Sequence, residues 1–562
     1  MKTKKFALQM TSMVAATALL ITGCASDSGS GGDSDKGDRQ KVTDAKASDY
    51  LKAERDELKD GGQLVTALGE IPEQQNVFHA DMVASTRVLW NWFNPQMIYF
   101  TPEGEPVNNP DYVTEMKADQ KDGNTVVHYK LNDKATFNDG TPIDYKAFET
   151  TWKINNGKDD AFAVNSTDGY ERITSVERGD SDKDVVVTFE GPYLYWPGLF
   201  NVIAHPAMGD AANFNDFVKK PHPEWGAGPF KLESMDFNRG EATFVRNENW
   251  WGEEGKLEKR IFRKLEPKAQ INAFKNGEID AVTATTKDNY AAVKDMTGVK
   301  VYSALDTRSG LLTMNSKAPN LSDAKVREAI AKTIDRDTLT NIVFNGLPYH
   351  GDPLNSMINF PYQKGYKDNF AEAVKYDPEE AKKLLDEAGW TEGGDGIRQK
   401  DGAPLTVRYV LFGDNETIAA LAKANQKMLR DIGIDLQIDN RPASEFSKTV
   451  KNRDFDILPS AWGATDPYSV AFFGQMYNSN STLNKSGTGT EELDKKIAEM
   501  AMMQDADKQM DRANELEKEA FQLYGIVPTY APASIVALKD GISNYGATGF
   551  ASFPVQNIGW KK

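Results

Sequence analysis

The stretch from Trp225 to Val282, WGAGPFKLESMDFNRGEATFVRNENWWGEEGKLEKRIFRKLEPKAQINAFKNGEIDAV, decides the fold. Two short apolar runs flank Asn238-Arg239-Gly240, which predicts a β-hairpin. Residues 259–265 alternate charged and apolar side chains, as a half-buried strand does. A helix is expected to open at Pro267 and to stop at Gly277, and a strand follows at 279–282. This order predicts a lobe of the α/β class.

Strands and helices also alternate in the last third of the chain. Short apolar runs at 405–411, 434–438 and 455–458 read as strands, and amphipathic segments between them read as helices. Alternation of this kind predicts a second α/β lobe with parallel strands. We expect a long helical segment at 493–523 and final strands at 526–538.

Composition excludes several classes of protein. A chain of 562 residues with 40% hydrophobic content can form more than one core. Residues 1–23 contain three lysines and no acid, so removing them leaves 63 basic and 83 acidic residues, a net charge of −20. Nucleic acid is not expected as a partner, because phosphate binding needs clustered cations.

The amino-terminal segment has the features of an export signal. A lysine-rich start precedes an apolar run from Phe6 to Ile21, and the run ends in Gly23-Cys24. Cys24 is the single cysteine, so no intrachain disulfide can form. The sequence around it resembles a bacterial lipobox, which implies cleavage before Cys24 and lipid attachment to it. Residues 25–39 are rich in Ser, Gly and Asp, a composition typical of a flexible tether.

Several motifs resemble one family. They are GPFKL, RNENWWG and AFKNGEIDAV in the quoted stretch, FNDGTPI at 137–143, and VREAIAKTIDRD at 326–337. Together they are similar to the bacterial extracellular solute-binding proteins of family five, the oligopeptide and dipeptide type that serves ABC importers. The resemblance covers the chain from about Gly61 to its end.

This resemblance implies a two-lobed fold like that of the periplasmic binding proteins, with mixed sheets flanked by helices, an extra subdomain and a hinge between the lobes. The expected division is a signal peptide at 1–23, lipidated Cys24 and tether at 24–60, lobe one at 61–95, 221–315 and 525–562, an inserted subdomain at 96–220, and lobe two at 316–524.

The expected ligand-binding stretch is SAWGATDPYSVAFF, residues 460–473. It follows a predicted strand, and α/β sheets bind ligands beyond the carboxyl ends of their strands. In peptide-binding relatives an Asp three residues after a Trp pairs with the amino terminus of the peptide. Here Thr465 stands three residues after Trp462, and Asp466 follows it. Either Asp466 is the amine anchor, or Asp466-Pro467 is only a helix-capping turn.

Further candidates for the ligand site are weaker. They are Gly463 and Tyr468 in the same loop, Asn315 in a family-like N-x-K motif, and Trp90 in the aromatic segment 90–100. The aromatic segment fits either core packing or a cleft wall. Oligopeptides are the expected ligands. An oligosaccharide, a nickel chelate, haem or an opine remains an alternative.

No constellation of residues indicates catalysis. No nucleophile motif or P-loop occurs, and the five histidines are not paired at helical spacing. We therefore expect a non-enzymatic binding protein without metal or cofactor. An exported hydrolase is the distant alternative. The expected partners are a small solute, an ABC permease and, through the lipid alone, the outer face of the cytoplasmic membrane. A monomer is expected.

Overall fold

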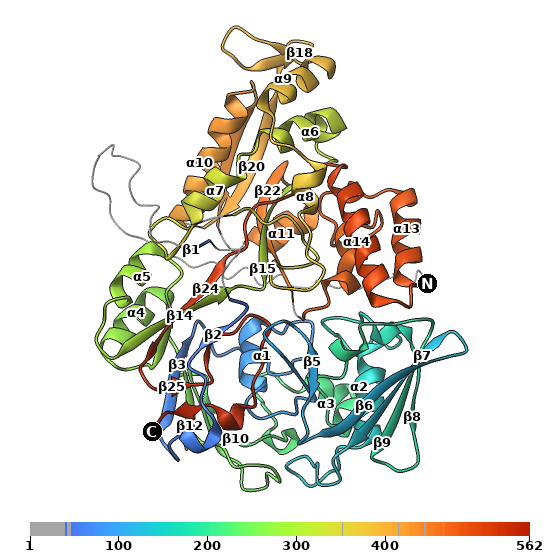
Figure 1. Ribbon diagram of the computed structural model, residues 1–562, viewed down its shortest axis with the longest axis vertical. Coiled ribbons are helices and arrows are strands. Elements are labelled where there is room, and N and C mark those ends of the chain that lie inside the picture. The colour runs from blue at the N-terminus through green and yellow to red at the C-terminus, as the bar shows by residue number, and fades with distance from the viewer. Residues whose placement is uncertain (1–39, 42–45, 351, 414, 443–444, 465) are drawn as a thin grey trace, which may run out of the picture.

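The computed structural model describes residues 40–41, 46–350, 352–413, 415–442, 445–464 and 466–562. The expected signal peptide and Cys24 lie outside the described residues. Two lobes stand one above the other, with the inserted subdomain beside the lower one (Figure 1). The expected two-lobed α/β fold is confirmed.

Lobe one is built on a seven-stranded mixed sheet. Only the neighbours β12–β3 and β3–β13 are parallel. The order is β10 (Phe230–Asp236), β11 (Glu241–Arg246), β12 (Lys259–Lys264), β3 (Gln63–Leu68), β13 (Ala281–Thr283), β24 (Ala533–Lys539) and β14 (Val299–Leu305).

The strands and the helix predicted for the stretch at 225–282 are all present in lobe one. β10 and β11 form the hairpin, in register from Phe230 opposite Arg246 to Asp236 opposite Glu241. Helix α4 (Pro267–Lys275) crosses from β12 to β13. Gly277 follows it with φ of 78°, a left-handed conformation that favours glycine and stops the helix.

The inserted subdomain contains a four-stranded antiparallel sheet. Its order is β6 (Val113–Lys121), β7 (Asn124–Leu131), β9 (Asp184–Phe189) and β8 (Ile173–Arg178). Helix α2 (Tyr145–Asn155) covers one face with Phe148 and Ile154 buried. The FNDGTPI motif feeds this helix, whose N-cap Asp144 accepts a hydrogen bond from the backbone of Lys146.

Lobe two is built on a five-stranded sheet. Its order is β21 (Asp435–Arg441), β20 (Thr406–Phe412), β22 (Ile457–Gly463), β15 (Arg308–Met314) and β23 (Ile526–Pro528). β20 runs parallel to both neighbours, whereas β15 is antiparallel to both of its own. The parallel character predicted for lobe two therefore holds for one half of the sheet.

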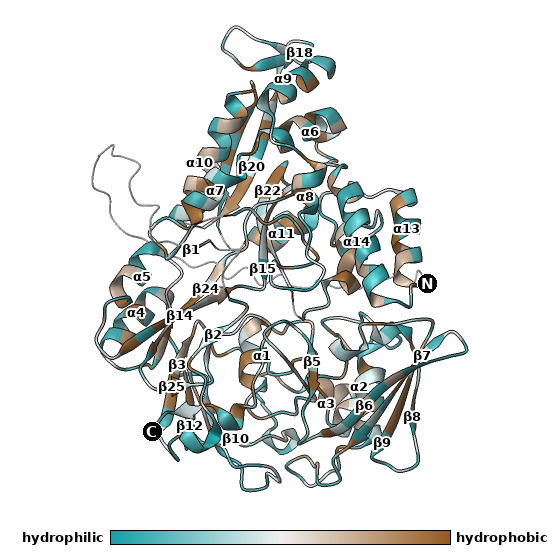
Figure 2. Cartoon of the chain, in the orientation of Figure 1, coloured by the Kyte–Doolittle hydropathy of each residue, from teal (hydrophilic) through white to brown (hydrophobic). Residues whose placement is uncertain are grey.

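Helices surround this sheet and form the largest apolar cluster with it. Figure 2 shows mostly apolar residues along its strands and mixed faces on the helices around it. The helices of this part are α6 (Ala324–Thr333), α7 (Arg336–Val343), α8 (Asn369–Ala373), α9 (Pro378–Glu387), α10 (Glu416–Arg430), α11 (Phe446–Asn452), α12 (Phe473–Tyr477), α13 (Glu491–Ala501) and α14 (Ala506–Phe521).

The crossings between the sheets differ from the boundaries expected at 315 and 525. β15 and β23 pair within the sheet of lobe two, so the chain crosses at 306–307 and 529–532. Residues 344–360 also depart from the expected layout, because several of their apolar side chains join the core of lobe one. Periodicity identifies a buried strand but not the sheet in which it pairs.

One local expectation is corrected. The segment 493–523 forms two helices, α13 and α14, which are interrupted at 502–505 and separately capped by Thr490 and Asp505. Helix α6 is capped by Asp323, which accepts a hydrogen bond from Lys325 N.

Candidate functional site

The predicted binding loop leaves the end of β22 at the boundary between the lobes. Trp462 pairs with Ser309 in the sheet and packs, half-buried, against the core of lobe two. Gly463 is exposed opposite Arg308. The next backbone group, Ala464 N–H, donates to the carbonyl of Thr307 at the first crossing, which fixes the start of the loop beside this crossing.

The loop then meets the inserted subdomain. The carboxylate of Asp466 accepts a hydrogen bond of 2.8 Å from Tyr468 N. The Tyr468 ring contacts Phe100 and Tyr195 of the subdomain, each at 6.0 Å between centroids. Asp466 and Tyr468 therefore lie where lobe two faces the other half of the molecule. Thr465 lies outside the described residues.

Arg87 is a charged residue of this region that the sequence analysis did not select. It belongs to α1 (Ala84–Trp90), on the side of lobe one that faces lobe two (Figure 1). Its side chain is exposed to solvent, yet surrounding protein lowers the pKa of its guanidinium, an effect that Asp466 and Tyr170 oppose.

The guanidinium of Arg87 forms no hydrogen bond or ion pair with any other residue in the described parts of the chain. The carboxylate of Asp466, which raises the pKa of Arg87 through its charge, belongs to the other lobe. No motif surrounds Arg87 in the sequence, so only the fold reveals it.

Trp90, on the same helix, is a core residue. It is 4% exposed and contacts the rings of Phe78, Phe93 and Phe217. Of the two explanations open for the aromatic segment, core packing applies to Trp90, which we leave out of the proposed site.

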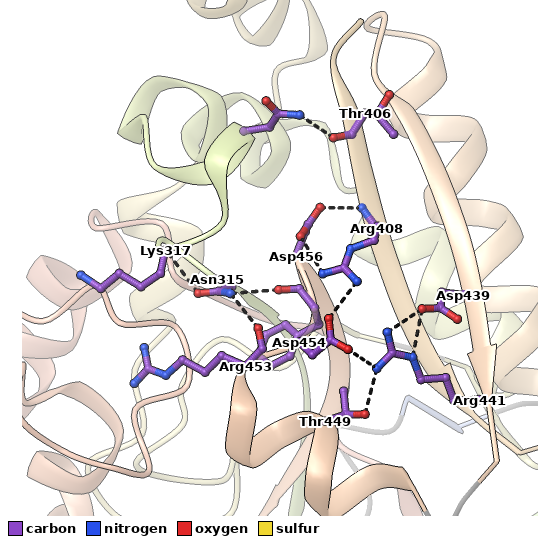
Figure 3. A network of polar contacts seen from close by, with 12 residues as sticks. Asn315, Lys317, Thr406, Arg408, Asp439, Arg441, Thr449, Arg453, Asp454 and Asp456 are labelled. Carbon is purple, nitrogen blue, oxygen red and sulfur yellow. Dashed lines mark hydrogen bonds and ion pairs between the residues drawn. The ribbon is translucent and has the colours of Figure 1, made fainter. Parts of the chain in front are cut away.

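Asn315 lies at the far end of β15 from Trp462. Its side-chain amide donates to the carbonyls of Arg453 and Phe455, at 3.2 and 2.9 Å, and its oxygen accepts from Lys317 N at 3.0 Å. Figure 3 shows this asparagine within a polar network that joins neighbouring strands of lobe two. The amide is thus engaged in holding the sheet together, and we leave Asn315 out of the proposed site as well.

Direct hydrogen bonds join the inserted subdomain to lobe two. Gln475 Nε2 donates to the carboxylate of Asp168 at 2.7 Å, and the Tyr195 hydroxyl donates to Gln509. Both bonds connect the inserted subdomain with lobe two, so the lobes are in contact along this edge.

The described residues contain no group of three or more metal-ligating side chains. None of their helices is both long enough and apolar enough to span a bilayer. A cavity of about 610 Å³ lies on lobe one, away from the binding loop. Charged side chains in its wall already pair with each other, such as Lys539 with Asp280 at 2.6 Å.

Comparisons with known proteins agree with this architecture. The family model "Bacterial extracellular solute-binding proteins, family 5 Middle" matches residues 109–484. The chain is 31% identical over 554 residues to the oligopeptide-binding protein OppA of Mycobacterium tuberculosis, covering 97% of this chain and 92% of that protein. It is 26% identical over 372 residues to the nickel-binding periplasmic protein of Escherichia coli, covering 63% of this chain and 68% of that protein.

Solved structures share the fold. A periplasmic EDTA-binding protein superposes with a TM-score of 0.83 at 23% identity, covering 93% of this chain and 99% of that chain. The oligopeptide-binding protein AppA of Bacillus subtilis, in complex with a nonapeptide, gives 0.72 at 19% identity, covering 90% and 100%. The chain therefore belongs to the bacterial extracellular solute-binding proteins of family 5, and it is a binding protein rather than an enzyme.

Proposed function

We propose that the protein captures oligopeptides between its lobes and delivers them to the permease of an ABC importer. The observation that carries this proposal is that Asp466, in the loop of lobe two, acts through its negative charge on Arg87 of lobe one. A peptide carries both charges that such a pair can bind. The 31% identity to an oligopeptide-binding protein over nearly the whole chain adds support.

Each end of the proposed site has its own chemistry. Asp466 accepts charge-assisted hydrogen bonds from the ammonium group of the peptide. Arg87 offers a planar fork of donors that matches a carboxylate, either the terminal one or a side chain. Hydrogen bonds from the main chain hold the backbone between them and do not depend on sequence.

Closure of the lobes couples binding to transport in this proposal. A ligand that contacts both lobes stabilises the closed form, and the permease recognises that form. The two crossings at 306–307 and 529–532 are the proposed hinge, since they join the sheets of the lobes.

The alternative is a non-peptide solute bound by the same fold. Relatives that bind nickel and EDTA favour it, because a metal chelate is rich in carboxylates and Arg87 could bind one. It does not require an ammonium group at Asp466, and this difference separates the two candidates.

The lipid anchor is part of the proposal. Cleavage before Cys24 and lipidation of its thiol would hold the binding domain at the outer face of the cytoplasmic membrane. Replacing Cys24 with serine should release the protein from the membrane fraction, whereas retention there would contradict the anchor.

Calorimetry with tri-alanine tests the peptide function. The proposal predicts saturable binding by residues 25–562, with affinity lost when the amino terminus is acetylated. Binding of nickel–EDTA in place of any peptide would contradict it and support the alternative.

A further inference from the structure

A small side pocket opens beside the binding loop. Its volume is about 140 Å³, and the inserted subdomain and lobe two both contribute walls. Whole small-molecule ligands occupy sites of roughly 300–1,000 Å³, so this pocket has room for one group of a larger ligand. Its polar lining residues are Asp168, Glu171, Arg172, Tyr193, Tyr195, Asp466, Tyr468 and Gln509.

The pocket is lined by three carboxylates and one cationic side chain, Arg172. Asp168 accepts hydrogen bonds from Ser166 and Gln475, and Glu171 accepts one from Thr167, so the donors that these two carboxylates have are neutral. No cation among the described residues lies within ion-pair distance of either. Desolvation raises the pKa of Glu171 and the charge of Asp168 adds to this effect, while the hydrogen bond from Thr167 and the charge of Arg172 oppose it in part. A cation in the pocket would offset both the desolvation of Glu171 and its repulsion by Asp168.

Arg172 does not neutralise these carboxylates by direct contact. Its guanidinium donates to the carbonyls of Glu190 and Pro192, at 2.7 and 3.1 Å, and lies over the ring of Tyr193 at 5.2 Å. Arg172, the one cationic side chain that lines the pocket, is thus held in place by neutral groups.

A buried phenol gives an independent indication of a ligand. Tyr193 is 9% exposed and lines the pocket, yet its hydroxyl has no hydrogen-bond partner among the described residues. A side chain at Gly169 would collide with this hydroxyl, so the glycine allows the phenol to lie at this position. The hydroxyl of Tyr468 is fully buried and has no partner among the described residues. Unpaired buried polar groups cost free energy, and a ligand that donates hydrogen bonds removes the cost.

We propose that this side pocket is a subsite for a basic side chain, lysine or arginine, next to the amino terminus of a bound peptide. The inference rests on the peptide function proposed above and adds a preference to it. Carboxylate and phenol oxygens both accept hydrogen bonds, and an ammonium or guanidinium group only donates them. Asp466 borders the pocket, which places the side chain of the first residue beside the amine anchor.

The test compares Arg-Ala-Ala with citrulline-Ala-Ala, whose side chain has nearly the same shape without the charge. Calorimetry should show the arginine peptide binding about tenfold tighter, as expected for hydrogen bonds to a charged group. Glu171→Gln should bring the two affinities close together. Glu177→Gln, which removes an exposed charge of the same subdomain outside the pocket, should leave the preference unchanged.

The remaining outcomes overturn the inference in distinguishable ways. Equal affinities for the two peptides, with Glu171→Gln weakening both, would assign the pocket to the amino terminus instead. An arginine preference that survives Glu171→Gln would place the basic side chain elsewhere. If neither peptide binds, the peptide function itself fails and the subsite falls with it.

Discussion

The two charged side chains of the proposed ligand site, Asp466 and Arg87, come from opposite lobes and differ in how far the sequence reveals them. Asp466 sits in a loop after a strand, close to a tryptophan, and both features indicate a ligand site. Arg87 is one of many charged residues on short helices, and its role depends on a desolvation that only the folded chain creates. Sequence patterns record local order, so a charge that matters through distant neighbours escapes them.

The amine anchor can be tested directly. Asp466→Asn should weaken binding of tri-alanine by about 1.5–3 kcal/mol, or about ten- to a hundredfold, because a charge-assisted hydrogen bond is lost. Binding of N-acetyl-tri-alanine should not change. Asp431→Asn, at the exposed end of α10, is the matched control. Equal losses for the free and acetylated peptides would contradict the assignment.

His205 should make stability depend on pH. It is 5% exposed, and burial lowers the pKa of its imidazole more strongly than Asp139, 3.2 Å away, raises it. The unfolded chain therefore takes up this proton at higher pH than the folded protein, so acid favours unfolding. Stability is fully present well above pH 6.5 and falls as the pH drops from about 6.5 toward the lower folded value.

The melting temperature between pH 7 and pH 5 measures this effect. His205→Asn should flatten the decline, while His128→Asn, which replaces an exposed histidine on β7, should not. An unchanged slope in the His205 variant would assign the decline to other groups.

At the scale of single elements, α14 is held in place by a buried carboxylate. Glu517 is 0% exposed and accepts hydrogen bonds from Ser356, Met357 N, Asn369 and Tyr477, at 2.8, 2.7, 2.7 and 3.3 Å. These donors come from the segment before α8, from α8 itself and from α12. One side chain therefore joins four separate parts of lobe two.

Removal of this carboxylate should destabilise the protein. Glu517→Ala leaves several buried donors unpaired, and we expect a loss of about 3 kcal/mol in the free energy of unfolding. Glu515→Ala, on the exposed face of the same helix, should cost less than about 0.5 kcal/mol. Urea unfolding measures both. Similar small losses in the two variants would show that the network is dispensable.

Secondary elements followed well from the sequence, and their assembly less so. Periodicity and stop signals located the hairpin at 230–246, the helix after Pro267 and the strands of lobe two, because these depend on local patterns. The sheet membership of β15 and β23 did not follow, because a buried apolar strand has the same pattern in either sheet. Trp90 remained open for a related reason, since a core and a cleft wall use the same aromatic residues.

At the scale of the whole molecule, contacts along one edge of the cleft should favour the closed form. Gln475→Ala removes the bond to Asp168 between lobe two and the inserted subdomain. A loss of about 1 kcal/mol from closure lowers peptide affinity about fivefold, because binding is coupled to the closed population. Gln437→Ala, at an exposed position of β21, is the control.

Small-angle scattering should detect the coupling between peptide binding and closure of the lobes. The radius of gyration is expected to fall when tri-alanine is added, and Gln475→Ala should need more peptide to reach the same contraction. A radius that stays constant at saturating peptide would contradict closure between the lobes.

The central claim, capture of oligopeptides, is tested most directly by native mass spectrometry of residues 25–562, purified without added ligand and then denatured to identify what is released. A ligand at about 100 times its dissociation constant adds about 2.7 kcal/mol of stability, so bound solute persists through purification. The account predicts a ladder of masses that correspond to short peptides. A single non-peptide mass, such as a metal chelate, would contradict it.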